Sequence, residues 1–79
     1  MANGIIINPG GLAYSSVALR DCLAASGAPA IELHLSNTPD PEGSPHASLI
    51  APIAKGQING LGLRSYMLAI SFFAREYPK

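Results

Sequence analysis

The chain has 79 residues, of which 48% are hydrophobic and 13% are charged, and its formal net charge is zero. This composition is typical of a small globular domain rather than of a disordered segment. Because the lysines and arginines are scattered and every apolar run is too short to cross a bilayer, we expect neither a nucleic-acid nor a membrane partner.

The first half of the chain predicts a strand, a turn and a helix. Residues 4–7 are a short apolar run of the kind found in strands buried on both faces of a parallel sheet. The turn sequence Asn-Pro-Gly-Gly follows at 8–11. Ser15 or Ser16 is expected to cap the helix, and Gly27 is expected to end it. The apolar stripe of this helix consists of Ala18, Leu19, Cys22 and Leu23.

Cys22 is the single cysteine, which excludes an internal disulfide and favours a reducing, cytoplasmic setting. Its place in the helical stripe favours a small core residue over a nucleophile. The first residues contain no basic segment of the kind that begins a signal peptide. We therefore expect a cytoplasmic chain without a leader.

The segment 30–36 alternates between apolar residues and residues that can do chemistry, as a strand with two different faces does. One face carries Ile31, Leu33 and Leu35. The other face carries Glu32, His34 and Ser36. A carboxylate two positions from an imidazole on one face can hydrogen-bond to it, fix its tautomer and stabilise its protonated form. The alternative is an amphipathic strand with one solvated face.

The second half of the chain predicts a long loop, a strand and a helix. Residues 37–48 contain three prolines and a glycine, so we expect an irregular loop, and loops of this length are more often functional than idle. A weaker strand is expected at 57–60. Ser65 is expected to cap a final helix. Three large side chains recur in it at helical spacing, Tyr66, Ile70 and Phe73.

The alternation of strands and helices predicts an α/β fold with a parallel sheet and right-handed crossovers. Ligands of such sheets bind at the carboxyl ends of the strands, where the turn at 8–11 and the segment 34–37 both lie. The backbone N–H groups at the start of two helices favour an anion there. The run at 60–65 departs from a dinucleotide-binding fingerprint at its last position, so no such cofactor is expected. A metal is not expected either, because no recognised ligand spacing links Glu32, His34, Glu42 and His46.

Four segments in order, at 5–10, 16–21, 31–37 and 54–62, closely resemble the type II 3-dehydroquinate dehydratases, or type II dehydroquinases. The resemblance implies a flavodoxin-like, three-layer fold with strand order 2-1-3-4-5, and assembly as trimers that form dodecamers. It covers only the C-terminal half of the family. Residues 1–79 are therefore expected to form one domain of about three strands with their helices, without the family's first two strands and mobile active-site loop.

The resemblance also implies roles for individual residues. His34 matches the general acid, and Glu32 matches the carboxylate that orients it. Asn8 matches the residue that holds the water or enolate region, while Leu35 and Ser36 match the pair that binds the substrate carboxylate. The remaining positions of the implied substrate site are Gly10, Gly11, Tyr14 and Asp21, of which the last serves a neighbouring subunit.

Some positions depart from the family pattern. Tyr14 stands in place of a substrate-binding histidine, and Pro41 and Pro45 stand in place of two arginines of the loop. The tyrosine that removes the proton, and an arginine that assists it, belong to the unmatched half. Because each such group contributes about 10²–10⁴ in rate, we expect the chain alone to be weak or inactive.

Two functions follow from these residues. In the first, the chain belongs to a lyase of the shikimate pathway of aromatic amino acid biosynthesis, which dehydrates 3-dehydroquinate to 3-dehydroshikimate through an enolate without a cofactor. It would be completed by a second chain, or be retuned with Tyr14 as base. The alternative is a non-catalytic assembly subunit or relic that keeps the oligomeric surfaces. In both, the strand at 4–7 is expected to be an open edge that pairs with another polypeptide.

Overall fold

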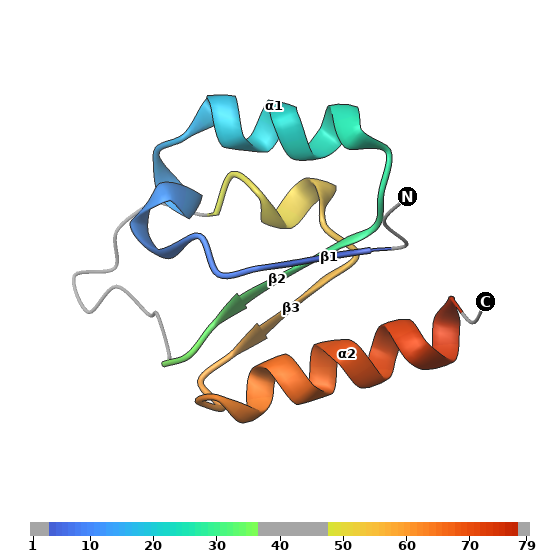
Figure 1. Cartoon of the computed structure of the whole chain (residues 1–79). Helices are drawn as coiled ribbons and strands as arrows, with labels where there is room; N and C mark the ends of the chain where they lie inside the picture. The colour runs from blue at the N-terminus through green and yellow to red at the C-terminus, as the bar shows by residue number, and fades with distance from the viewer. Residues whose placement is uncertain (1–3, 37–47, 78–79) are drawn as a thin grey trace.

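The computed structural model describes residues 4–36 and 48–77 and shows a small sheet between helices (Figure 1). In chain order the elements are β1 (Ile5–Ile7), the 3-10 helix η1 (Gly10–Tyr14), α1 (Val17–Ser26), β2 (Ala30–His34), the 3-10 helix η2 (Ala51–Ile53), β3 (Gly56–Asn59) and α2 (Arg64–Glu76). No helix within these two ranges is long and apolar enough to cross a membrane. Most of the predicted loop, at 37–47, lies outside the described residues.

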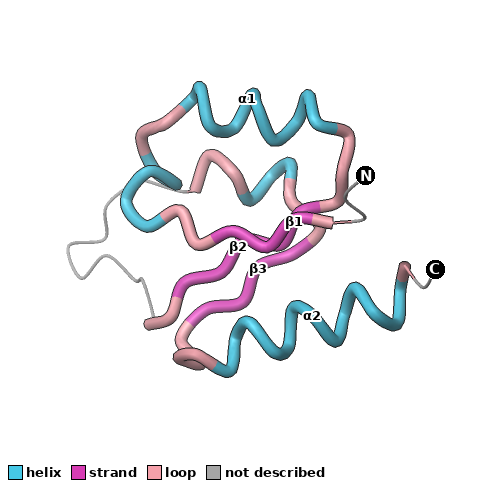
Figure 2. The backbone as a smooth tube through the Cα atoms, in the orientation of Figure 1, coloured by secondary structure: helices cyan, strands magenta, loops and turns pink. Residues whose placement is uncertain are grey.

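The described strands form one parallel sheet in the order β1-β2-β3. In its register, Glu32 of β2 lies between Ile7 of β1 and Gln57 of β3. The helix α1 and the two 3-10 helices lie on one side of the sheet, and α2 lies on the other (Figure 1 and Figure 2). The predicted α/β fold with a parallel sheet in three layers is therefore confirmed.

Each face of the sheet has its own apolar cluster. On the side of α1, the buried members are Ala13, Leu23 and Ile50. On the side of α2, the buried members are Ile31, Leu33 and Ala69, and Leu35 packs against them. The apolar residues of the alternating segment therefore share one face of β2, as predicted. The opposite face of β2 is left to Glu32 and His34.

The ends of α1 follow the predicted capping residues. At the start, Ser16 Oγ accepts a hydrogen bond from the backbone N–H of Leu19 at 3.0 Å. At the end, Gly27 has a φ of 73°, in the left-handed region that a residue without a Cβ adopts at little cost. Both predictions are confirmed. They could be made from the sequence because helix capping depends on residues that are close in the chain.

The predicted apolar stripe of α1 is only partly correct. Leu23 is buried and Leu19 is half-buried, whereas Ala18 and Cys22 are exposed. The prediction that Cys22 is a core residue is therefore wrong. The helix α1 contacts η2 and reaches the core mainly through Leu23, so the part of its surface that meets other elements is narrower than the stripe in the sequence.

Two strand predictions need correction. The residues of β1 are half-buried, because β1 is an edge of the described sheet. The prediction that this strand is buried on both faces is therefore wrong. The prediction that it forms an open edge is confirmed for the described residues. The strand β3 is found at Gly56–Asn59, one position before the predicted 57–60.

The start of α2 also differs from the prediction. Ser65 does not cap the helix, because it lies inside the first turn with its own backbone N–H already bonded to the carbonyl of Gly62. Its side chain is completely buried. Tyr66 and Phe73 pack against the α2-side cluster as their spacing predicts, but Ile70 is 52% exposed. Ile70 therefore lies beyond the margin of the packed face.

Candidate active site

A cavity of about 340 Å³ lies where β1 and β2 end, at the edge of the sheet where a site is predicted. Three segments contribute to it: the turn after β1, the helix η1 and the end of β2. The lining residues are Asn8, Gly10, Gly11, Tyr14, His34, Leu35 and Ser36. All of them are predicted site residues, so the fold brings together segments that α1 separates along the chain.

His34 and Glu32 form the hydrogen bond that their spacing predicts, with 2.7 Å between Nε2 and Oε2. His34 is 5% exposed and Glu32 is 0% exposed. The imidazole lines the cavity, while the carboxylate is not part of the lining and supports the ring from within the protein. Because Nε2 faces the carboxylate, proton exchange with a ligand would run through Nδ1. A protonated ring would form a charge-assisted pair with Glu32.

Two further residues hold the Glu32 carboxylate. Ser48 Oγ lies 2.9 Å from Oε1 and 2.8 Å from Oε2, and Gln57 Nε2 lies 3.0 Å from Oε1. Neither contact is predicted from the sequence. The parallel register of β2 and β3 contains a signal for Gln57, since it places that residue beside Glu32. No local pattern marks Ser48, which η2 and its preceding turn bring to the carboxylate.

Tyr14 forms a wall of the cavity beside the imidazole. Its ring stacks near that of His34, with centroids 6.2 Å apart and planes inclined by 26°. Tyr14 ends η1, and Gly10 begins this helix with a φ of 59°. Residues other than glycine rarely adopt that backbone conformation, so the path of η1 toward the cavity depends on a glycine at this position.

Asp21 lies apart from the cavity. It is exposed on α1 and forms an ion pair with Arg20, with 2.9 Å between Oδ1 and Nη2. Its role toward a neighbouring subunit stays a prediction. Within 4–36 and 48–77, no cluster of three or more His, Cys, Asp or Glu is suited to a metal. Glu42 and His46, two of the four residues compared above with metal-ligand spacings, lie outside the described residues.

Comparison with known proteins gives a consistent result across sequence and structure. The family described as Dehydroquinase class II matches residues 1–74. A 3-dehydroquinate dehydratase from Bacillus licheniformis is 54% identical over 77 residues, covering 98% of this chain and 53% of the relative. One from Roseiflexus castenholzii is 58% identical over 71 residues, covering 90% of this chain and 45% of the relative. The chain thus spans about half the length of the curated relatives it matches.

Solved structures show the same relation. The type II dehydroquinase from Propionibacterium acnes superimposes with a TM-score of 0.83 at 36% identity, covering 92% of this chain and 50% of that one. The type II dehydroquinase from Butyrivibrio crossotus gives 0.80 at 43% identity, with 90% and 50% covered. The resemblance predicted from the four segments is confirmed, and the chain belongs to the class II, or type II, dehydroquinase family.

Proposed function

We propose that this chain carries the proton-donating and carboxylate-binding part of a 3-dehydroquinate dehydratase active site. The relatives from Bacillus licheniformis and Roseiflexus castenholzii both bear that name. The observation that carries the proposal is the buried pair of His34 and Glu32 at the wall of a cavity that Asn8 and Ser36 also line. Such a pair provides a general acid whose orientation is fixed before a substrate arrives.

In the proposed reaction, a base removes a proton from the carbon next to the ketone of 3-dehydroquinate, and the C–H electron pair forms an enolate. The enolate then expels the hydroxyl group of the neighbouring carbon while His34 Nδ1 transfers its proton to that oxygen. Water leaves, and the carbon–carbon double bond of 3-dehydroshikimate forms. Glu32 keeps its hydrogen bond to Nε2 throughout. The family resemblance assigns the base to a tyrosine in the half that this chain does not match.

The cavity offers a distinct group to each part of the substrate. We assign the substrate carboxylate to the backbone of Leu35 and the hydroxyl of Ser36, which follow His34 at the end of β2. Asn8, on the other strand end, is assigned to the enolate or the leaving water. Tyr14 presents a ring face where the family has a histidine, so we expect it to pack against the carbon ring of the substrate rather than replace a positive charge.

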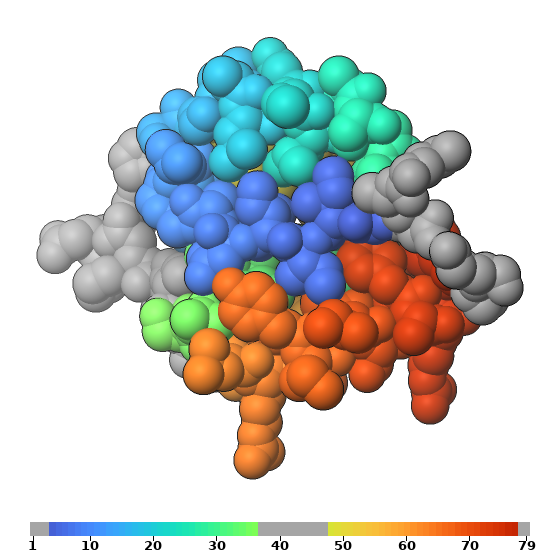
Figure 3. Space-filling view, viewed as in Figure 1, coloured from blue at the N-terminus to red at the C-terminus, as the bar shows by residue number. Residues whose placement is uncertain are grey.

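We also propose that a second polypeptide segment completes the site along the open edge of β1. Figure 3 looks onto this edge, with α1 above it and α2 below it. A strand that adds in parallel to β1 would satisfy its open backbone groups, and an attached helix would pack beside α2. The segment is expected to come from the remaining half of the family fold, on a separate chain or on a copy of this one.

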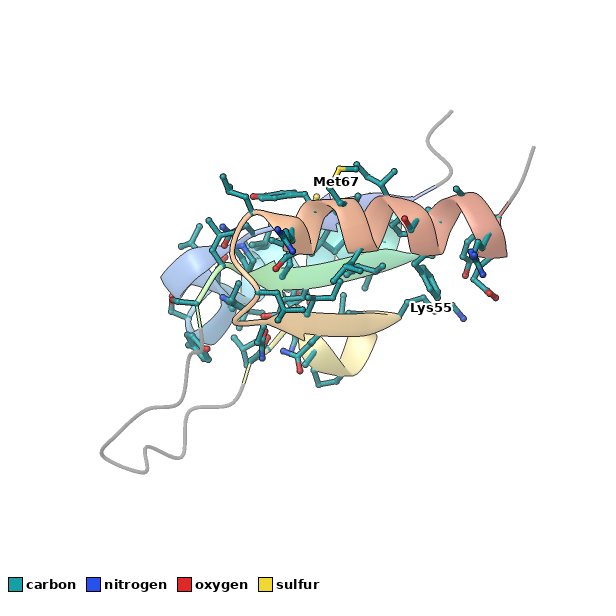
Figure 4. All side chains as sticks on the ribbon, turned by 90° about the horizontal axis from the view of Figure 1, so that it is seen from below. Lys55 and Met67 are labelled. Atoms are coloured by element: carbon teal, nitrogen blue, oxygen red, sulfur yellow. The ribbon has the colours of Figure 1, made fainter. Side chains whose placement is uncertain are left out.

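Exposed apolar side chains of α2 support this assignment. Phe73 lies beside Gly4, next to β1, whereas Phe72 lines a groove along β3, and these two contacts orient the helix. Helical spacing then places Met67 and Ile70, which are 65% and 52% exposed, on the side of β1. Figure 4 shows Met67 on the side of α2 that is remote from β3. The same surface supports the second candidate, a non-catalytic subunit that retains only the assembly contacts.

One experiment separates these two functions. The chain is produced together with the part of the Bacillus licheniformis relative that it does not match, and formation of 3-dehydroshikimate is followed by the absorbance of its conjugated carbonyl. We expect turnover from the mixture and its loss by about 10²–10⁴ in His34→Ala. The control Ser26→Ala should show no loss, since among the described residues its hydroxyl bonds only to backbone at the end of α1. A stable complex without turnover would support the non-catalytic subunit.

We also propose a location for the reaction. We place it in the cytoplasm, where the family resemblance sets the shikimate pathway and where a lone cysteine such as Cys22 stays reduced. Fractionation of cells that produce the chain tests this assignment, and recovery with a membrane or periplasmic fraction would contradict it.

A further inference from the structure

We propose that Ser48 and Gln57 are positioning residues for His34. Both donate hydrogen bonds to the Glu32 carboxylate, which then acts only as an acceptor and keeps one oxygen directed at the imidazole ring. Glu32 is completely enclosed, and a carboxylate removed from water needs donors from the protein. Among the residues that the structure describes, three side chains supply them, at 2.7 to 3.0 Å from its oxygens. The inference rests on the proposed function only in taking His34 as the proton donor.

The direction of the Ser48 hydroxyl follows from its other contacts. A hydroxyl has one proton to donate and two lone pairs that accept. The backbone N–H groups of Ile50 and Ala51 donate to Ser48 Oγ at 3.0 and 3.1 Å, which occupies both acceptor positions. The single proton must therefore point at Glu32, where it is shared between Oε1 and Oε2. The turn into η2 thus fixes Ser48 as a donor to the carboxylate.

Gln57 completes the arrangement from the neighbouring strand. The register of β2 and β3 places it directly beside Glu32, and its amide donates to Oε1 at 3.0 Å. Oε1 therefore accepts from the amide, the Ser48 hydroxyl lies between the two oxygens at 2.9 and 2.8 Å, and Oε2 also faces His34 Nε2 at 2.7 Å. Donors at both oxygens resist rotation of the carboxylate about the terminal side-chain bond, so Oε2, the acceptor that orients the imidazole, keeps its place.

Removal of either donor is expected to act on turnover rather than on substrate binding, because neither residue lines the cavity. In the completed enzyme, Ser48→Ala should lower kcat by about 10- to 100-fold, as expected for a hydrogen bond to a charged group. Gln57→Leu should lower it by about 3- to 10-fold, since Gln57 is exposed and water can replace its amide. KM should change by less than about threefold in both variants.

The deciding readout is the hydrogen bond itself. The chain is labelled with ¹⁵N-histidine, in the assembly that it forms, and the Nε2 proton of His34 is observed by NMR and assigned by its absence in His34→Ala. A proton held by a short bond to a carboxylate resonates far downfield and exchanges slowly with water. We expect it to shift upfield and exchange faster in Ser48→Ala, and to a smaller degree in Gln57→Leu. Ser48→Thr, which keeps a hydroxyl, should restore it.

Each outcome separates the positioning role from the proposed function. Ser26→Ala, the matched loss of a serine hydroxyl, should leave both signal and kcat unchanged. A wild-type signal in Ser48→Ala and Gln57→Leu, with unchanged kcat, would overturn the inference while the function stands. A shifted signal in a chain that shows no turnover would uphold the inference and remove the function. If Ser48→Ala fails to fold, the Gln57→Leu signal and Ser48→Thr rescue decide.

Discussion

Gly4→Ala is expected to destabilise the packing of β1 against α2. A Cβ at this position would lie 2.5 Å from Phe73 Cε1 and 2.7 Å from Cδ1 and Cζ, whereas carbon atoms in contact prefer about 3.5–4.0 Å. The ring must therefore withdraw by about 1 Å from the cluster around Ile31, Leu33 and Ala69 against which it packs. Overpacking of this kind costs about 1–3 kcal/mol.

A smaller effect opposes this cost. Alanine restricts the unfolded chain more than glycine does, which returns about 0.4–1 kcal/mol where the backbone is compatible, as it is here because Gly4 has no positive φ. The net loss is about 1–2 kcal/mol. For a chain of this size that corresponds to a fall in Tm of about 5–15 °C. Thermal unfolding followed by circular dichroism, at a fixed protein concentration because the chain is expected to associate, measures it.

Two variants control for the backbone effect and for the ring. Gly56→Ala adds a methyl group where no atom lies within 4 Å, so it should leave Tm unchanged or slightly higher. In a Phe73→Leu background, Gly4→Ala should lower the free energy of unfolding by less than half as much as it does beside Phe73, since the smaller side chain leaves room. Equal Tm values for Gly4→Ala and Gly56→Ala would refute the close approach. So would a loss of unfolding free energy from Gly4→Ala that is as large beside Leu at position 73 as beside Phe73.

Three other outcomes are expected. Ser65→Ala should raise the free energy of unfolding by about 1–3 kcal/mol, because the buried Ser65 hydroxyl has no hydrogen-bond partner among the described residues; a lower denaturation midpoint would show that the hydroxyl is bonded. The 79-residue chain should sediment as an assembly in dilute, low-salt buffer, and a compact 8.2 kDa monomer at micromolar concentration would contradict the open edge as an interface. The chain alone should not dehydrate 3-dehydroquinate at usual enzymatic rates of about 1–10³ s⁻¹, and turnover in that range would remove the need for a second segment.

The parts of the fold that were predictable depend on short-range chemistry. The two-residue period of a strand assigns Ile31 and Leu33 to one face and Glu32 and His34 to the other, whatever packs against them. A serine before a helix and a glycine after it act through bonds to nearby backbone, which is why the caps of α1 were correct. The carboxyl-end rule for parallel strands located the cavity between segments distant in sequence.

The errors and omissions all involve contacts that sequence spacing does not determine. Cys22 belongs to the same predicted helical stripe as Leu23, yet only Leu23 faces the core, because tertiary packing decides which face of α1 meets η2. Ser65 has a side chain suited to capping, but it lies two residues after the N-cap position at Leu63, because the turn at Gly62 starts α2 at Arg64. Ser48 contacts Glu32 across sixteen positions and is held there by backbone N–H groups at the start of a 3-10 helix, whose short sequence gives no periodic signal.

The central claim is that His34 donates the proton to the leaving oxygen. It is tested most directly by following deuterium exchange and dehydration in the same reaction. The completed enzyme is incubated with 3-dehydroquinate in deuterated water, and mass spectrometry measures deuterium entry next to the ketone together with dehydration. If His34 acts after the enolate forms, His34→Ala should keep deuterium exchange within about 10-fold of wild type while dehydration falls by about 10²–10⁴. Parallel loss of exchange and dehydration would make His34 part of the base, and unchanged dehydration would exclude it from the site's chemistry.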